Sequence, residues 1–414
     1  MEERIKKADS MKHIYIINNS NSPAFGYGVG TYVTQLLKCM EGNEMNLTVI
    51  NLDSLRDKFE ISEDNRIRTI QIPFHHSSLI KKTSARALKY ISYLLTYYIN
   101  SNEKNIFHFN FIEQGELAKR LKSQYPDCKI ILTIHYLSWL METKGSLTKL
   151  QTIINKEKKS RNYTEQAIYQ EYDENLDFIE NADKIICLSK YTKALFCQQL
   201  GVDSNKIELI YNGLEDNSIH FSEQERSFLR SQYLLSDCEK VILFVGRVDK
   251  LKGIEYLMEA FRLTLKSISN ARLIIVGDGD YKLCLEKSPD IWTKVTFTGK
   301  IPKEKLIQFY QLADVGVLPS FCEQCSYTAI EMMMNNLPFI GTSSTGLKEM
   351  LDNRPEDIIP LTEEAGEVLF PVDKLAGRLI KHLSHPQKTG KSMYENRYSL
   401  KKMRIKINRL YSTL

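Results

Sequence analysis

The chain has 414 residues, of which 43% are hydrophobic and 26% are charged, so we expect two or three globular domains and not a disordered chain. The net charge of +5 slightly favours an anionic ligand or an anionic membrane surface and gives no reason to expect nucleic-acid binding. No run of about 18 apolar residues occurs, and the start of the chain lacks the apolar core of a signal peptide, so we expect a cytoplasmic protein.

Short runs rich in valine and isoleucine alternate with amphipathic helical stretches. Most of these runs have no polar face, as is typical of parallel strands covered by helices on both sides. The predicted strands are 13–19, 46–52, 106–110, 129–135, 184–189, 206–211, 241–246, 271–277, 295–299, 315–320 and 338–343. Helices are expected between them, for example over 31–40 and 253–268. Such units in two halves predict an α/β fold with two doubly wound, Rossmann-like domains facing across a cleft.

A polar stretch at 211–240 follows the sixth predicted strand and marks a domain boundary. We place the hinge at 212–219, with one domain over 1–217 and the second over 218–394. The basic amphipathic stretch at about 395–414 is predicted to be a helix that packs back on the first domain. Nothing in the sequence indicates the oligomeric state.

Open α/β sheets bind ligands beyond the carboxyl ends of their strands, so the residues there are the candidates for a site. After 241–246 come Arg247, Lys250 and Lys252, at the start of a predicted helix. Cations beside the free amides of a helix N-terminus suit a diphosphate, and we assign that role to Arg247 and Lys252. For Lys250 a solvated basic loop is the simpler interpretation.

Two glycine-rich turns also follow strands. Gly277 and Gly279 fit either close approach to a ligand or merely a tight turn. Gly26, Gly28 and Gly30 precede the first predicted helix but do not match the dinucleotide fingerprint, which disfavours a nicotinamide enzyme. They fit a loop whose backbone approaches a phosphate or sugar, or a flexible surface loop.

His135 ends the fourth predicted strand. A histidine there can hydrogen-bond a sugar or act as an acid or base, and a structural role is the alternative. His108 lies inside a strand and is expected to be structural.

The stretch "FCEQCSYTAIEMMM" allows two interpretations. Cys322 and Cys325 could be a redox couple or half a zinc site, but no second Cys/His pair has suitable spacing. Glu323 and Glu331 flank the predicted start of a helix near Tyr327, where both carboxylates could meet one elongated ligand and the first amides its phosphates. A glycosidase pair fits poorly, because both carboxylates serve one edge of the ligand. We therefore favour the glutamates.

Taken in order, these motifs resemble the retaining GT-B fold glycosyltransferases of family 4 (glycosyl transferases group 1). The resemblance rests on the glycine loop, His135, "IYNG", "VGRVDKLKG", "VGDGD", "FTGKI", "ADVGVLPS" and the two glutamates, and it covers most of the chain. It implies an acceptor-side domain over 1–217 and a nucleotide-sugar-binding domain over 218–394.

The resemblance also implies residue roles. Arg247 and Lys252 would hold the donor diphosphate, Glu331 the ribose and Glu323 the transferred sugar, with His135 near the reaction centre. No metal and no cofactor would be needed. The remaining donor-binding residues would be Gly28, Gly30, Gly246, Gly277, Gly279, Gly299, Lys300, Ile301, Cys325, Ser326, Tyr327 and Thr328.

Two positions depart from the family pattern. Ser326 stands where glycine is usual, and Tyr136 stands where aspartate is common after the histidine. The first bears on the sugar subsite, and the second on the role of His135.

The implied function is retaining transfer of a hexose or N-acetylhexosamine from a nucleotide sugar to a glycan, lipid-linked sugar or peptide, and UDP, the commonest nucleotide of this family, is the expected carrier. The alternatives are a non-catalytic nucleotide-sugar-binding protein and a sugar-nucleotide epimerase or phosphorylase. A basic, tyrosine-rich stretch at 75–100 fits peripheral membrane contact, and a long helix predicted over 158–183 fits the border of an acceptor groove. Each also fits an ordinary surface helix.

Overall fold

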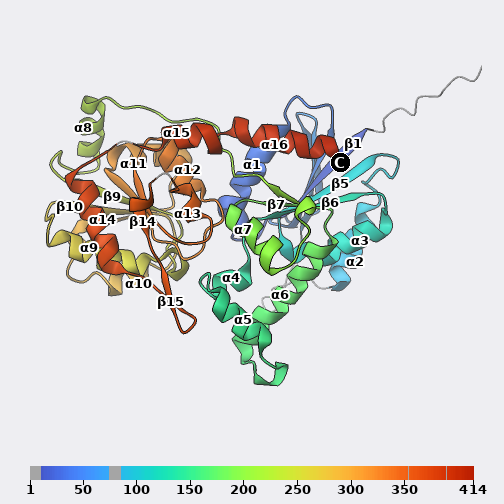
Figure 1. The fold of residues 1–414 in the computed structure, drawn as a ribbon. Helices are drawn as coiled ribbons and strands as arrows, with labels where there is room; N and C mark the ends of the chain where they lie inside the picture. Colours follow the sequence, from blue (N-terminus) through green and yellow to red (C-terminus); the bar gives the residue numbers. More distant parts are fainter. Residues whose placement is uncertain (1–10, 74–84, 353, 388) are drawn as a thin grey trace, which may run out of the picture.

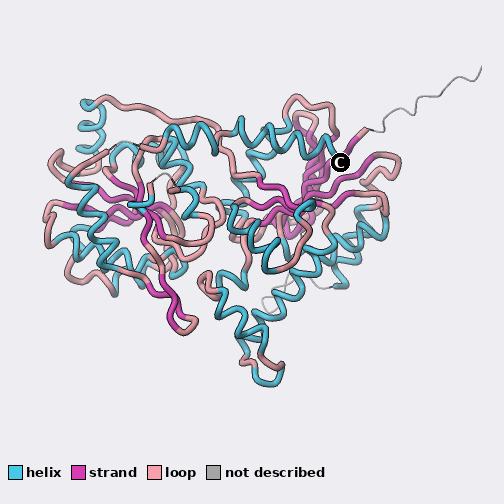
Figure 2. The backbone as a smooth tube through the Cα atoms, in the orientation of Figure 1, coloured by secondary structure: helices cyan, strands magenta, loops and turns pink. Residues whose placement is uncertain are grey.

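The computed structural model describes residues 11–73, 85–352, 354–387 and 389–414. They form two α/β domains, each a layer of strands flanked by helices (Figures 1 and 2). This confirms the predicted fold class. The stretch 74–84, part of the predicted membrane-contact segment, lies outside the described residues.

The first domain is built on an eight-stranded sheet with the order β3-β4-β2-β1-β5-β6-β7-β8. All neighbouring strands run parallel except β3 and β4. The strands are β1 (Lys12–Asn19), β2 (Asn46–Ser54), β3 (Glu60–Asp64), β4 (Ile67–Pro73), β5 (Lys104–Phe109), β6 (Lys129–Ile134), β7 (Lys184–Cys187) and β8 (Ile207–Leu209). The helices are α1 (Gly30–Met40), α2 (Ala85–Leu95), α3 (Gly115–Gln124), α4 (Ser138–Glu142), α5 (Leu147–Asn155), α6 (Tyr163–Asn181) and α7 (Lys190–Ala194).

The second domain has a six-stranded parallel sheet with the order β11-β10-β9-β12-β13-β14. The strand order reverses between β9 and β12, which opens a crevice at the carboxyl ends of these two strands. The strands are β9 (Lys240–Val245), β10 (Ala271–Val276), β11 (Val295–Gly299), β12 (Val315–Leu318), β13 (Phe339–Thr342) and β14 (Ile358–Ile359). The helices are α8 (Glu223–Gln232), α9 (Ile254–Leu265), α10 (Tyr281–Glu286), α11 (Lys303–Leu312), α12 (Tyr327–Met334), α13 (Leu347–Met350) and α14 (Val372–Ser384).

A hairpin of β15 (Thr362–Glu364) and β16 (Glu367–Leu369) projects from the second domain toward α5 of the first (Figure 1). Lys149 on α5 pairs with Glu367 at 2.6 Å. The two domains therefore touch at the hairpin as well as at the chain crossings.

The chain crosses between the domains twice, at neighbouring places. After α15 (Lys391–Met393) and a turn at Tyr394–Tyr398, α16 (Leu400–Thr413) returns to pack along α1 (Figure 1). The two crossings are hydrogen-bonded, because Leu214 N donates to Tyr398 O at 3.0 Å and Leu400 N donates to Leu214 O at 2.9 Å. Buried Ile407 and Tyr411 fix α16 to the first domain.

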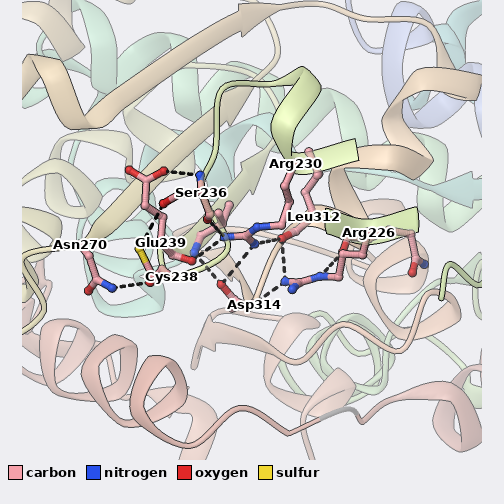
Figure 3. A network of polar contacts seen from close by, with 10 residues as sticks. Arg226, Arg230, Ser236, Cys238, Glu239, Asn270, Leu312 and Asp314 are labelled. Carbon is pink, nitrogen blue, oxygen red and sulfur yellow. Dashed lines mark hydrogen bonds and ion pairs between the residues drawn. The ribbon is translucent and has the colours of Figure 1, made fainter. Parts of the chain in front are cut away.

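Two arginines of α8 anchor the start of the second domain (Figure 3). Arg230 is 1% exposed and donates to the carbonyl oxygens of Leu312, Ser236 and Glu239. Arg226 donates to Leu312 O and to Asp314 Oδ1, each at 2.9 Å. Asp314 in turn accepts the amide of Val241 at 2.7 Å, so α8 is tied to the first strand of its sheet.

Within the part of the chain that the structure describes, no helix is long and apolar enough to cross a membrane.

Candidate functional site

The loops after β9, β10 and β11 hold one another through their backbones. Val248 N donates to Asp278 O at 2.8 Å, and Gly277 N donates to Gly299 O at 3.0 Å. A Cβ on Gly277 would lie 1.9 Å from Gly246 O, and one on Gly279 would lie 2.2 Å from Val248 O. In this structure, therefore, the lack of a side chain on these glycines lets neighbouring protein backbone come close.

Arg247 and Lys252 stand on one turn after β9. Asp249 organises this turn, because its Oδ2 lies 3.2 Å from Arg247 Nη2 and its Oδ1 accepts the amide of Lys252 at 2.9 Å. Lys252 Nζ forms an ion pair with Glu323. Lys250 is exposed, and its side chain forms no hydrogen bond or ion pair within the described residues, as its assignment to a solvated loop predicts.

Glu323 is held on three sides in the loop between β12 and α12. Ser320 Oγ donates to its carboxylate at 3.0 Å, and its own amide donates to Thr345 Oγ1 at 2.9 Å. Its carbonyl oxygen accepts the amide of Gly346 at 2.6 Å. The carboxylate is therefore fixed beside Lys252 before any ligand arrives.

Ser326 is the N-cap of α12. Its backbone is extended, with φ −69° and ψ 120°, so the position does not require glycine. Its Oγ accepts the amide of Ala329 at 3.4 Å. The amides of Ser326, Tyr327 and Thr328 donate to no acceptor within the described residues and are available to an anion.

Glu331 lies in the second turn of α12. Burial raises the pKa of its carboxyl, and the hydroxyl of Tyr310 and the nearby Lys303 act in the opposite direction. Tyr310 OH donates to Glu331 Oε2 at 2.7 Å. The carboxylate thus has a fixed orientation and one oxygen left for another donor.

Cys322 and Cys325 are free thiols. Cys325 is buried in the core, and burial raises the pKa of Cys322 to about 12. Both are thus protonated at neutral pH and act as packing residues. Among the described residues, no group of three or more His, Cys, Asp or Glu side chains is placed to hold a metal ion.

The glycine loop of the first domain, residues 25–30, meets the segment after β11 across the crevice. Lys300 Nζ donates to Gly26 O at 3.4 Å and lies 4.9 Å from the centre of the Tyr27 ring. Ile301, beside it, packs against the core. The predicted donor-site elements of the two domains are therefore in contact.

Two glycines of this loop differ in their surroundings. A Cβ on Gly30 would lie 2.2 Å from Phe25 O, so the backbone turn itself requires this glycine. Gly28 has no atom within 4 Å of its Cβ position and faces open space.

His135, just beyond β6, begins a row of side-chain amides along the carboxyl edge of the first sheet. Its Nε2 lies 3.1 Å from Asn110 Oδ1, Asn110 donates to Asn18 at 3.0 Å, and Asn18 donates to Asn51 at 3.1 Å. Burial lowers the pKa of His135 to about 3, so the ring is neutral. The bond to an amide oxygen places its proton on Nε2 and leaves Nδ1 as an acceptor.

Tyr136 turns away from the edge of this row. Burial raises the pKa of its hydroxyl, which hydrogen-bonds Glu113 and Ser22. It therefore cannot orient His135 as a carboxylate there would.

The predicted site residues fall into three groups. In the second domain, Lys252 and Glu323 are brought into contact, with Arg247 on the turn that carries Lys252 and Glu331 on the helix that follows Glu323. The glycine loop and His135 belong to the first domain. Gly277, Gly279 and Gly30 sit where close backbone packing demands glycine, whereas a Cβ on Gly246 would meet only the Phe244 ring, at 3.5 Å. The sequence analysis missed Tyr310, Thr345 and the asparagine row, whose partners lie far away in the chain. It also missed Asp249, which lies beside its partners inside a motif already examined and could have been found.

Both halves of the chain match family models. Residues 27–218 match the model described as Glycosyltransferase Family 4, and residues 225–399 match Glycosyl transferases group 1. An uncharacterized glycosyltransferase from Methanocaldococcus jannaschii is 32% identical over 197 residues, 46% of this chain and 50% of that protein. A lipopolysaccharide 1,2-N-acetylglucosaminetransferase from Salmonella typhimurium is 26% identical over 183 residues, 42% of this chain and 47% of that protein. The match to each of these two relatives spans about half of their length.

Solved structures share the fold over nearly the whole chain. Sucrose-phosphate synthase from Thermosynechococcus elongatus superimposes with a TM-score of 0.73 at 21% identity, covering 97% of this chain and 98% of that one. An Anabaena protein solved with UDP and glucose gives a TM-score of 0.67 at 14% identity, covering 97% and 99%.

Two Rossmann-like domains in one chain have the fold of the GT-B class. The two family matches, one over each domain, make the chain similar to glycosyltransferases of family 4 and group 1.

Proposed function

We propose that the protein transfers a hexose or an N-acetylhexosamine, with retention of configuration, from a UDP-linked sugar to a glycan, lipid-linked sugar or peptide. The observation that carries this proposal is the Lys252–Glu323 ion pair beside the unpaired amides at the start of α12. Where the loop after β9 meets the loop between β12 and α12, it offers a cation and free N–H groups to a diphosphate, and a carboxylate to sugar hydroxyls. The lipopolysaccharide relative's name and the UDP-bound neighbour support the choice of sugar and nucleotide.

The chemistry follows from charge. Negative charge grows on the diphosphate as the sugar–phosphate bond breaks, and fixed cations with oriented amides lower the barrier. Arg247 and Lys252 supply those cations, so we propose a reaction without metal or cofactor. Glu331 would accept the ribose hydroxyls, and Glu323 those of the sugar. We assign no protein nucleophile, and retention then requires attack by the acceptor on the face that the diphosphate leaves.

Neutral His135 would accept a hydrogen bond from the sugar through Nδ1, a weaker role than that of a base. Its pKa of about 3 makes it a poor proton acceptor at neutral pH.

The location of the protein is a further proposal: cytoplasmic, with contact to an anionic membrane surface. On and just after α2, the side chains of Tyr90, Tyr93 and Tyr97 are exposed, and tyrosine suits the membrane–water interface. Co-sedimentation with vesicles of anionic and of neutral lipids tests this, and equal absence from both pellets contradicts it.

The reaction is tested by hydrolysis of a panel of nucleotide sugars without and then with glycan acceptors. Arg247→Ala and Lys252→Ala should each lower turnover about a hundredfold. Lys250→Ala, on the same turn but exposed, is the matched control and should leave turnover unchanged. Equal activity of Arg247→Ala and the wild type would contradict the assignment. Nucleotide binding without turnover would identify a binding protein instead, and a rearranged donor would identify an epimerase.

A further inference from the structure

The loop that carries Glu323 is held to the first domain through the two residues that follow it, Gln324 and Cys325. Gln324 Oε1 accepts the hydroxyls of Ser189, at 3.1 Å, and Thr192, both on the first domain. Asn212, in the crossing between the domains, donates from Nδ2 to Cys325 O at 2.7 Å. We call these two contacts the loop clamp.

The clamp fixes the direction of a peptide group. In a trans peptide the carbonyl of one residue and the amide of the next point in opposite directions. Because Asn212 holds the carbonyl of Cys325, the amide of Ser326 points away from the crossing. This amide is one of the unpaired N–H groups at the start of α12.

Two buried polar side chains of the clamp, Gln324 and Asn212, are unfavourable for the stability of the folded protein. Gln324 and Asn212 are 6% and 3% exposed, yet Gln324 Nε2 and Asn212 Oδ1 have no hydrogen-bond partner within the described residues. A buried polar atom without a partner costs free energy, so apolar side chains would pack this interface more favourably. The polar atoms of these two side chains that do form hydrogen bonds, Gln324 Oε1 and Asn212 Nδ2, are those that hold the loop in place.

We propose that Thr192, Gln324 and Asn212 are positioning residues for donor binding: they orient Glu323 and the Ser326 amide from the first domain, and so make the donor site depend on how the domains meet. This inference rests on the proposed function. It assigns a role to residues that touch no part of the expected donor. A change in the domain contact at Thr192 should therefore change the affinity of the protein for the diphosphate.

The test is binding of UDP, GDP, ADP and the matching monophosphates by calorimetry. Thr192→Val keeps the shape of the side chain and removes the hydroxyl, and it should weaken the best nucleoside diphosphate about tenfold, and its monophosphate less. Thr192→Ser restores the hydroxyl and should bind within about twofold of the wild type. Asn212→Asp, which loses the donor to Cys325, should repeat the effect of Thr192→Val.

The control is Thr264→Val on α9, where a buried threonine hydroxyl also donates, at 2.8 Å, but far from the clamp. It should leave affinity unchanged while altering the melting temperature about as much as Thr192→Val. The clamp proposal is overturned if Thr192→Val binds with wild-type affinity, or if Thr192→Ser binds as weakly as Thr192→Val. Neither result contradicts the proposed function. A wild-type protein that binds none of the nucleotides overturns both.

Discussion

At the scale of single residues, Glu331 shows a conflict between stability and the proposed function. Its pKa is raised by burial, so the folded protein holds this proton more tightly than the unfolded chain. Ionisation at neutral pH therefore lowers the free energy of unfolding. Glu331→Gln, which can still accept from Tyr310, should raise that free energy by roughly 1 kcal/mol at about pH 7.

The same substitution should weaken UDP binding about tenfold, because an amide accepts ribose hydroxyls less strongly than a carboxylate. Urea unfolding and calorimetry check the two effects. The stability gain should vanish in acid, where the wild-type carboxyl is also protonated. A gain that persists at acid pH would contradict burial as the cause.

Lys252 and Glu323 should act as one unit. Each loses its partner when the other is removed, so Lys252→Ala and Glu323→Gln should be far from additive in donor turnover. We expect the double variant to be about as slow as the worse single variant. A double-mutant cycle with Arg247→Ala and Glu323→Gln is the comparison, since Arg247 pairs with Asp249 and not with Glu323. Strict additivity in the first cycle would show that the ion pair has no part in turnover.

At the scale of elements, α8 depends on Arg230. Arg230→Met removes a buried donor to three carbonyl oxygens; Leu312 O keeps Arg226 and Ser236 O keeps the amide of Glu239, so Glu239 O loses its donor, and the change should cost about 2 kcal/mol in urea unfolding. Arg262→Met is the control, because Arg262 pairs with Asp290 at the surface and should cost under about 1 kcal/mol. If Arg230→Met lowered the free energy of unfolding as little as Arg262→Met, water would have replaced the hydrogen bonds of Arg230.

The strands were largely predictable from the sequence because most are apolar on both faces. The missed elements lack that signal. In the β3–β4 hairpin, β3 is exposed throughout. Its turn places Asn65 and Arg66 at positive φ, and this pair does not predict such a turn as an Asn-Gly pair would. β14 has only two residues and exists because β13 offers it an edge.

The site was predictable to the extent that its residues are close in the chain or follow strands. Spacing placed Glu323 and Glu331 around the start of a helix, and that helix begins at Tyr327 as predicted. Tyr310 and Asn212 could not be found this way, because their contacts join segments that only the folded chain brings together.

At the scale of the whole molecule, buried histidines should make stability depend on pH. Burial lowers the pKa of His108 and His135 to about 3 each. Between about pH 6.5 and 3 the unfolded chain therefore binds protons that the folded protein does not, and stability falls as the pH falls. Urea unfolding from about pH 7 to 4 should show this slope, and above about 6.5 these histidines add none.

His108→Gln should flatten the slope, with exposed His220→Gln as the control. His108 is bonded to Tyr411 and Thr133 on its two nitrogens, and glutamine can offer one polar group to each. An unchanged slope in His108→Gln would assign the acid sensitivity to other groups.

The hairpin contact should make the spacing of the domains depend on salt. Lys149 and Glu367 are both partly exposed, so their attraction is screened. Glu367→Lys should increase the radius of gyration measured by X-ray scattering at low salt, and raised salt should reduce the difference. Glu363→Lys, on the same hairpin but without a lysine partner within the described residues, is the control.

The return of α16 to the first domain has a consequence for synthesis. The ribosome makes the first domain before the second, yet the helix that covers α1 follows the second domain in the chain. Until α16 emerges, the side of α1 that it covers, which includes Cys39, is exposed, so a nascent chain should need a chaperone's protection through most of translation. A chain truncated before α16 would keep this surface exposed, and that exposure would distinguish it from the full-length protein.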